Sequence, residues 1–222
     1  WRRGETILNF ASPTSLGPDW CQTKLLKLRF KGKNNVYTVL YCYNLVSYAV
    51  WNEATIFDFI EDDIFFEVLY PQELSYTYRL RQAKNIGIPF THVFHGVRLV
   101  VADPMECCSL PYNAPELKGA VALVSRGDCS FVSKAIKAEQ AGALAVIVMD
   151  NNPENDEFYI EMVKDDTNRD PKIPAAFLLG KSGYMIAKIL SDEHEEAAII
   201  NIPVNLTSVP FHKLNQPPWI IW

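Results

Sequence analysis

The fold is decided by GAVALVSRGDCSFVSKAIKAEQAGALAVIVMDNN, residues 119–152, and by KIPAAFLLG, residues 172–180, with an acidic loop between them. Three apolar runs of strand length, rich in alanine and β-branched residues, predict strands at Ala120–Val124, Ala143–Met149 and Ile173–Leu179. Pro174 lacks a backbone N–H, so it places the third strand at a sheet edge or marks its first residue.

A helix over about 130–141 separates the first two strands. Asp128 or Ser130 can cap its N-terminus, and Gly142 stands where a residue with positive φ ends a helix. One face of this helix is expected to be buried and rich in small residues, which lets the helix lie close on a sheet; it consists of Val132, Ala135, Ile136 and Glu139.

The flanking sequence predicts mostly β-structure. Ile64–Tyr70 and Leu74–Leu80 are aromatic and β-branched runs split by Pro-Gln-Glu, which indicates a hairpin. Val97–Ala102 is a further strand, and Met105–Lys118 is predicted to be a surface loop because it holds two prolines and an asparagine.

Towards the C-terminus, Phe158–Val163 is predicted as a short strand or a helical turn. Gly180–Leu190 is predicted as a second helix with Ser182 as its cap, and Ala197–Val204 as the last strand. The tail Pro210–Trp222 holds three prolines and two tryptophans, so we expect an extended strap packed along the body; an exposed aromatic tail would instead bind a partner.

These features resemble the protease-associated (PA) domain, above all in ALVSRGDCSFVSKA at residues 122–135. The acidic run 150–186 and the tail 202–222 resemble the small secreted glycoproteins of that family, which consist of little more than one PA domain. The resemblance covers about residues 61–222 and implies an α/β (α+β) fold, a β-barrel or sandwich with two short helices packed on it, without catalytic residues of its own.

Three segments are therefore expected. Residues 1–55 show no periodicity that fits the rest and lie outside the fold, residues 61–205 form the PA domain, and residues 206–222 form a proline- and tryptophan-rich tail. No methionine precedes Met105, so we expect residues 1–104 to lack the natural start of the protein.

The segment 24–49 bears on the cellular compartment. Basic residues from Lys24 to Lys33 precede the apolar stretch Val36–Val50, and Ser47 and Ala49 supply small residues where a signal peptidase cleaves. We interpret 24–49 as a secretory signal peptide and expect no membrane span in the mature chain, because a span needs about 20 apolar residues. The alternatives are an ordinary buried strand and translated noncoding sequence.

The sequence also carries one glycosylation signal, Asn205-Leu206-Thr207, which predicts a glycan on Asn205. The resemblance implies the same, because Asn205 matches the position of a glycan site in the family. Together with the signal peptide, this predicts a secreted, extracellular protein.

The cysteines are consistent with that compartment. Cys107 and Cys108 are adjacent and rarely bond each other, so one of them is expected to pair with Cys129. The alternative is three reduced, buried thiols. The resemblance implies that Cys108 and Cys129 form the disulfide and that Cys107 has no counterpart.

Metal and cofactor chemistry find little support in the sequence. The four histidines lack an H-E-x-x-H helix, so we predict no metal site and no cofactor; they are His92, His95, His194 and His212. The net charge of −5, without a basic stripe, argues against nucleic acid, and we predict no nucleic-acid partner.

Nucleophilic catalysis is disfavoured as well. Cys129 precedes a helix, which would stabilise a thiolate, but no histidine is near it in sequence and a structural disulfide is favoured. Ser125 and Ser130 lack a G-x-S-x-G elbow. The tripeptide 126–128, Arg-Gly-Asp, is interpreted as a turn in which the aspartate caps the helix rather than as an adhesion motif.

These observations predict a non-enzymatic, secreted glycoprotein that binds an unknown protein or peptide partner. The predicted binding surface combines the loop Asn151–Asp170 with the aromatic tail. The alternative is a PA-domain fragment of a larger peptidase, sorting receptor or membrane ubiquitin ligase.

Overall fold

The computed structural model divides the chain into two units, Trp1–Asp58 and Phe59–Trp222. The residues whose structure is described are 26–31, 36–42, 45–46, 63–206, 209 and 214–220.

The first unit contains a three-stranded antiparallel sheet in the order β1-β2-β3. Its strands are β1 (Leu26–Lys31), β2 (Val36–Cys42) and β3 (Leu45–Val46). That residues 1–55 lie outside the PA domain stays a prediction; β2 falls in the apolar stretch Val36–Val50, for which a strand was the alternative to a signal peptide. The strands of this sheet lie within the predicted signal peptide, whose cleavage residues 47–49 fall outside the described residues.

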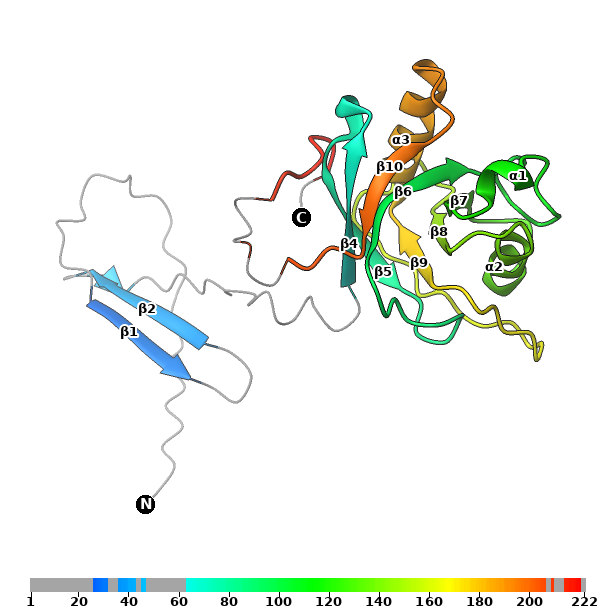
Figure 1. The fold of residues 1–222 in the computed structure, drawn as a ribbon. Helices are drawn as coiled ribbons and strands as arrows, with labels where there is room; N and C mark the ends of the chain where they lie inside the picture. Colours follow the sequence, from blue (N-terminus) through cyan, green and yellow to red (C-terminus); the bar gives the residue numbers. More distant parts are fainter. Residues whose placement is uncertain are drawn as a thin grey trace. The chain divides into compact units, whose positions relative to one another are not determined.

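The second unit is a closed barrel of seven strands in the order β10-β4-β5-β9-β8-β7-β6 (Figure 1). Neighbours from β6 to β9 run parallel, and the remaining pairs are antiparallel. The strands are β4 (Asp63–Tyr70), β5 (Thr77–Gln82), β6 (Phe94–Val101), β7 (Val121–Ser125), β8 (Ala145–Met149), β9 (Ala175–Leu178) and β10 (Ala198–Ile202). This confirms the predicted α+β barrel, with every predicted strand of the core sequence present.

The parallel strands form the centre of the domain because both of their faces are covered. Every residue of β7, β8 and β9 is buried, as their unbroken apolar sequences require. One face packs on α2 (Phe131–Gln140), which Figure 1 shows beside β7 and β8, and the other faces β4, β5, β10 and α3 (Gly180–Asp192). The buried residues thus form two apolar clusters, one on each face of the sheet made by β7, β8 and β9.

The α2 helix begins and ends where predicted, but its buried face differs. Ser130 is the N-cap and accepts a hydrogen bond from the Ser133 N–H at 3.1 Å, whereas Asp128 lies in the turn with φ 63° and is exposed. Ile136 and Glu139 are only partly buried. The buried residues are Val132, Lys134, Ala135 and Ala138.

The α3 helix lies against the end of β8 because one of its positions has no side chain. A Cβ on Gly183 would stand 2.4 Å from the Met149 Cβ, so only glycine allows this approach. The predicted cap was wrong: Leu179 is the N-cap, without a side-chain bond, and Ser182 is buried inside the helix.

Two loop predictions also need correction. Phe158–Val163 forms neither a strand nor a helical turn. The segment Met105–Lys118 is a loop, but it carries the four-residue helix α1 (Ala114–Leu117) and buries Cys107 and Leu117 completely. A short 3₁₀ helix, η3 (Gln72–Leu74), joins β4 to β5.

Candidate functional site

The loop between β8 and β9, which contains the predicted binding loop Asn151–Asp170, is fixed to the barrel at its start by an amide and a carboxylate. The Asp150 carboxylate is buried and accepts hydrogen bonds from Arg126 Nη1 at 3.0 Å and Asn155 Nδ2 at 2.6 Å. Asn155 also donates to the Phe158 carbonyl at 2.8 Å, and its Oδ1 accepts from the Phe158 N–H at 2.9 Å. Asn155 thereby closes a turn that sets the direction of the following residues.

The middle of the loop is held by Tyr159. Its hydroxyl donates to the Arg79 carbonyl on β5 at 3.3 Å, and its ring meets the Phe177 ring edge-on at 6.5 Å between centroids. The Arg81 guanidinium lies 4.8 Å from the centre of the same ring, within cation–π range. Burial raises the pKa of Tyr159, so the hydroxyl stays a donor.

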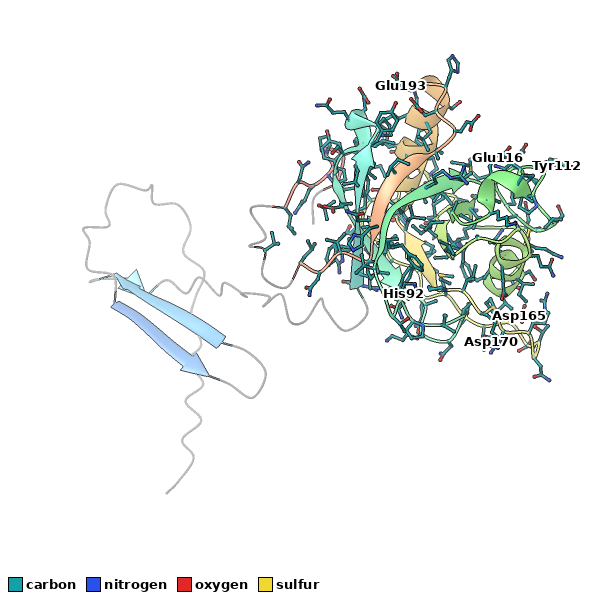
Figure 2. All side chains as sticks on the ribbon, viewed as in Figure 1. His92, Tyr112, Glu116, Asp165, Asp170 and Glu193 are labelled. Atoms are coloured by element: carbon teal, nitrogen blue, oxygen red, sulfur yellow. A yellow bond between two sulfur atoms is a disulfide. The ribbon has the colours of Figure 1, made fainter. Side chains whose placement is uncertain are left out.

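The far end of the loop is attached to the N-terminus of α2. The Asp165 carboxylate accepts hydrogen bonds from Ser130 Oγ at 2.5 Å, from the Thr167 hydroxyl and from Arg169 Nη2 at 2.9 Å. Arg169 also donates to Ser133 Oγ at 3.0 Å. Figure 2 shows Asp165 and Asp170 together on this side of the domain, away from Tyr112 and Glu116 near α1.

The Asp165 attachment predicts a pH-dependent stability. Hydrogen bonds from Ser130 and Thr167, and then the charge of Arg169, lower the pKa of Asp165 to about 2 from its ordinary 3.8. A carboxyl whose pKa is lower in the folded state stabilises the fold above its ordinary pKa, and this contribution is lost as the pH falls towards 2. Asp165→Asn should therefore be less stable than wild type at pH 6, with the difference shrinking at pH 2.

Denaturant unfolding of both proteins at the two pH values measures this effect. The matched control is Asp166→Asn, which changes the adjacent, exposed aspartate. An Asp165→Asn deficit that stays constant between pH 6 and pH 2 would contradict the assigned role.

The outer face of the loop is apolar at two positions. Phe158 is 73% exposed and Val163 is 70% exposed, although Met162 between them is buried. A cavity of about 80 Å³ lies under the loop beside Arg81 and Ile160, far below the roughly 300–1,000 Å³ of small-molecule sites. The loop thus offers exposed side chains rather than a ligand-sized pocket.

The tail packs at the start of β5, in the apolar cluster of Phe66 and Tyr78 rather than in the cluster that contains Tyr159. The Thr77 N–H donates to the Asn215 carbonyl at 2.7 Å, and Trp219 packs edge-on against Tyr76 at 5.6 Å between ring centroids. Ile220 is buried. The described part of the tail therefore faces the barrel and does not extend the apolar surface of the loop; residues 210–213 and 221–222 lie outside the description.

The cysteines are arranged as the resemblance implied. The structure joins Cys108 to Cys129 with a Cα–Cα distance of 5.8 Å, and both residues are partly exposed. Cys107 is a free thiol and completely buried. Burial raises the pKa of Cys107 to about 11, so this thiol stays protonated and unreactive at neutral pH.

Sequence reasoning missed the residue next to the disulfide. Lys134 on α2 is fully buried; its Nζ donates to the Glu106 carbonyl at 2.5 Å and lies 3.6 Å from Cys108 Sγ. Burial lowers the pKa of Lys134. Spacing alone could have placed Lys134 beside the buried Ala135 and Ala138, but lysine is almost never buried, and this masked the signal.

The other candidate residues occupy structural positions. Ser125 is buried and Ser130 caps α2. The guanidinium of Arg126 is bound to Asp150, so the Arg-Gly-Asp tripeptide forms a turn.

The predicted glycan site and His92 lie in loops of the described region. Asn205 follows β10 and is exposed. His92 lies in the loop before β6 (Figure 2) and packs on Phe94 at 4.4 Å between ring centroids; His212 lies outside the described residues. Within the part of the chain that the structure describes, no three His, Cys, Asp or Glu residues are grouped to hold a metal, and no helix is long and apolar enough to cross a membrane.

The sequence profile of the PA domain matches residues 95–186, from β6 into α3. A PRADC1-like protein of Drosophila melanogaster is 51% identical over 167 residues, which cover 74% of this chain and 85% of that protein. The chain therefore belongs to the PA-domain family, and within it to the PRADC1-like proteins.

Other known proteins are less similar to this chain. Signal peptide peptidase-like 5 of Oryza sativa subsp. japonica is 36% identical over 94 residues, 42% of this chain but 17% of that protein. A zinc aminopeptidase from Bacillus subtilis aligns in structure at a TM-score of 0.42 and 21% identity, over 64% of this chain and 30% of its own. The chain spans a small part of these larger proteins, and their activities are not transferred to it.

Proposed function

We propose that this protein is a secreted, non-catalytic glycoprotein whose single PA domain binds a protein or peptide partner. The observation that carries this proposal is the loop between β8 and β9, which exposes Phe158 and Val163 while its other side is bonded to the barrel. Loops of this length without secondary structure are uncommon in compact domains unless they are functional or disordered, and the bonds of this loop favour a functional role.

Fixing the loop before binding favours affinity. A partner that covers Phe158 and Val163 binds a segment that is already ordered, because the Tyr159 hydroxyl is bonded to β5 and the Asp165 carboxylate to the N-terminus of α2. Exposed aromatic side chains on a rigid support are typical of residues whose truncation costs more than about 1 kcal/mol of binding free energy.

The non-catalytic part of the proposal rests on the structural roles of the residues that could have been nucleophiles. Cys129 is in a disulfide, Ser130 Oγ serves the helix N-terminus and Asp165, and Ser125 is buried. Each residue for which a nucleophilic role could be argued therefore already has a structural task.

A binding experiment tests the surface. Secretory fluid is passed over immobilised wild-type protein and over the double variant Phe158→Ser/Val163→Ser. We expect one or more proteins to be retained by wild type and lost, by about tenfold or more, in the variant. The matched control is Tyr112→Ser, because Tyr112 is 82% exposed and lies near α1, away from the loop (Figure 2). Equal retention by the double variant, or loss in the control alone, would contradict the assignment.

A second experiment tests the compartment. Expression in secreting cells should give a glycosylated protein in the medium, and Asn205→Gln should increase its gel mobility by one glycan. Asn168→Gln is the control, since Asn168 is also exposed but stands outside an N-x-S/T sequence. The proposal fails if the Asn205→Gln protein migrates like wild type or if the wild type remains in the cytosol.

A further inference from the structure

The region around the disulfide contains a buried charge that forms no direct ion pair. Lys134 is fully buried, and its ammonium is bonded to the Glu106 carbonyl and to Cys108 Sγ. Across residues 63–206 and the described part of the tail, the structure contains no ion pair between Lys134 and a carboxylate. Burial lowers the pKa of Lys134, and the charges of the Asp128 and Glu106 carboxylates raise it by less, without forming an ion pair with the ammonium. Burying an ammonium without a directly bonded anion is costly, so this site favours a change that creates a negative charge in contact with Lys134.

Reduction of the disulfide creates such a charge. The Cys108 sulfur, 3.6 Å from Lys134 Nζ, becomes a thiolate that the ammonium can pair with. Stabilising the reduced form makes a disulfide more oxidising and easier to open. A lysine beside a cysteine also lowers the pKa of the thiol, which makes that sulfur the better leaving group in exchange.

We propose that Cys108–Cys129 is a thiol–disulfide exchange site for small thiols of the glutathione class, with Cys129 as the sulfur that is attacked and Cys108 as the leaving thiolate. Cys129 is partly exposed in the turn before α2. It stands between the exposed Asp128 and Ser130, the N-cap of the helix. The N-terminus of α2 also favours a thiolate on Cys129, but only Cys108 Sγ has a full positive charge at 3.6 Å, on Lys134 Nζ. The ammonium therefore sets the direction: the incoming thiol bonds to Cys129 and the electron pair stays on Cys108.

The exchange is balanced by two thiols. The first thiolate attacks Cys129 Sγ; the Cys108–Cys129 bond breaks, the mixed disulfide on Cys129 forms, and Cys108 keeps the electron pair beside Lys134. A second thiolate attacks the sulfur of the bound small thiol and releases the small disulfide. Cys129 then leaves as a thiolate and takes a proton from water. The protein gains two electrons and the two thiols lose them.

Cys107 takes no part in this exchange although it is next to Cys108. Its sulfur is buried and points to the Lys134 carbonyl at 3.8 Å, on the inner side of α2. The free thiol therefore stays in the core while the partly exposed pair reacts. Cys107→Ser is for this reason the matched control for the reactivity of the pair.

The first test needs only the wild-type protein. The oxidised full chain is incubated at pH 7 with reduced glutathione and iodoacetamide, and the products are mapped by peptide mass. We expect the intermediate to carry glutathione on Cys129 and carbamidomethyl on Cys108. The opposite arrangement, or no mixed disulfide while the pair stays oxidised, would overturn the proposal.

The second test measures the contribution of Lys134. In glutathione redox buffers, Lys134→Met should lower the equilibrium constant for reduction about tenfold, which corresponds to about 30 mV for this two-electron couple. Lys134→Arg keeps the charge, so its equilibrium constant for reduction should be closer to that of the wild type. Cys107→Ser should have the same constant as the wild type. Equal constants for Lys134→Met and wild type would refute the role of the ammonium. If Lys134→Met does not fold, the labelling pattern of the wild type decides.

Discussion

Phe177→Ala is expected to lower the free energy of unfolding by about 3–5 kcal/mol, the range found when a buried phenylalanine is truncated. Phe177 is completely buried in the middle of β9, between β5 and β8, so the barrel can close the resulting cavity only in part. Its ring also supports Tyr159, which holds the loop between β8 and β9 to the barrel. The loss of stability should therefore be accompanied by faster amide exchange in the loop.

Denaturant unfolding monitored by tryptophan fluorescence measures the loss, and hydrogen exchange follows the loop. The matched control is Phe158→Ala, which removes the same side chain from a position that is 73% exposed and should change the stability by about 0.5 kcal/mol or less. Similar effects of the two substitutions would show that the placement of these two rings is wrong.

The two phenylalanines also show what the sequence could and could not predict. Phe177 lies in an apolar run of strand length, AAFL, so its burial followed from the pattern. Phe158 lies in a polar stretch whose apolar residues do not repeat at a helical or strand spacing. Its exposure depends on two hydrogen bonds: one joins Asn155 to the Phe158 backbone, and the other joins Tyr159 to Arg79, which is distant in sequence. Periodicity finds elements that repeat along one face, and it cannot find a loop that is fixed by individual bonds.

The α2 helix, beside the disulfide, also shows what sequence patterns can and cannot predict. Its ends could be predicted because capping depends on neighbours in sequence: Ser130 caps the first turn, and Gly142 has φ 85° after the last. Its buried face could not, since that face is set by where the helix rests on β7 and β8. The rotation towards Lys134 and Ala138 brings a lysine into the core that composition alone assigns to solvent.

The family resemblance supplied what local patterns could not. The choice of Cys108 over Cys107 as the partner of Cys129 follows from neither spacing nor elimination, since either adjacent cysteine closes a loop of almost the same length. The structure distinguishes them by direction. The Cys108 chain points to the turn before α2, while Cys107, with φ 50°, points to the core.

Removing the disulfide is the second change with a large expected effect. The bond connects residues 21 apart, and in the chain-entropy model a loop of that length contributes roughly 3 kcal/mol by restricting the unfolded chain. Cys108→Ser/Cys129→Ser should lower the free energy of unfolding by about that amount, measured by denaturant unfolding without reductant. A variant as stable as the oxidised wild type would contradict the stabilising role of the bond.

A comparison with the reduced wild type separates the two roles of Cys108. Both proteins lack the cross-link, so they share the gain in entropy of the unfolded chain. Only the reduced wild type offers Lys134 a thiolate, because a serine hydroxyl stays neutral at pH 7. We therefore expect the reduced wild type to be more stable than the double-serine variant at pH 7, with the difference removed when Lys134→Met is introduced into both. If the two proteins are equally stable before that substitution, the bond acts only as a cross-link and Lys134 has no electrostatic partner in the reduced state.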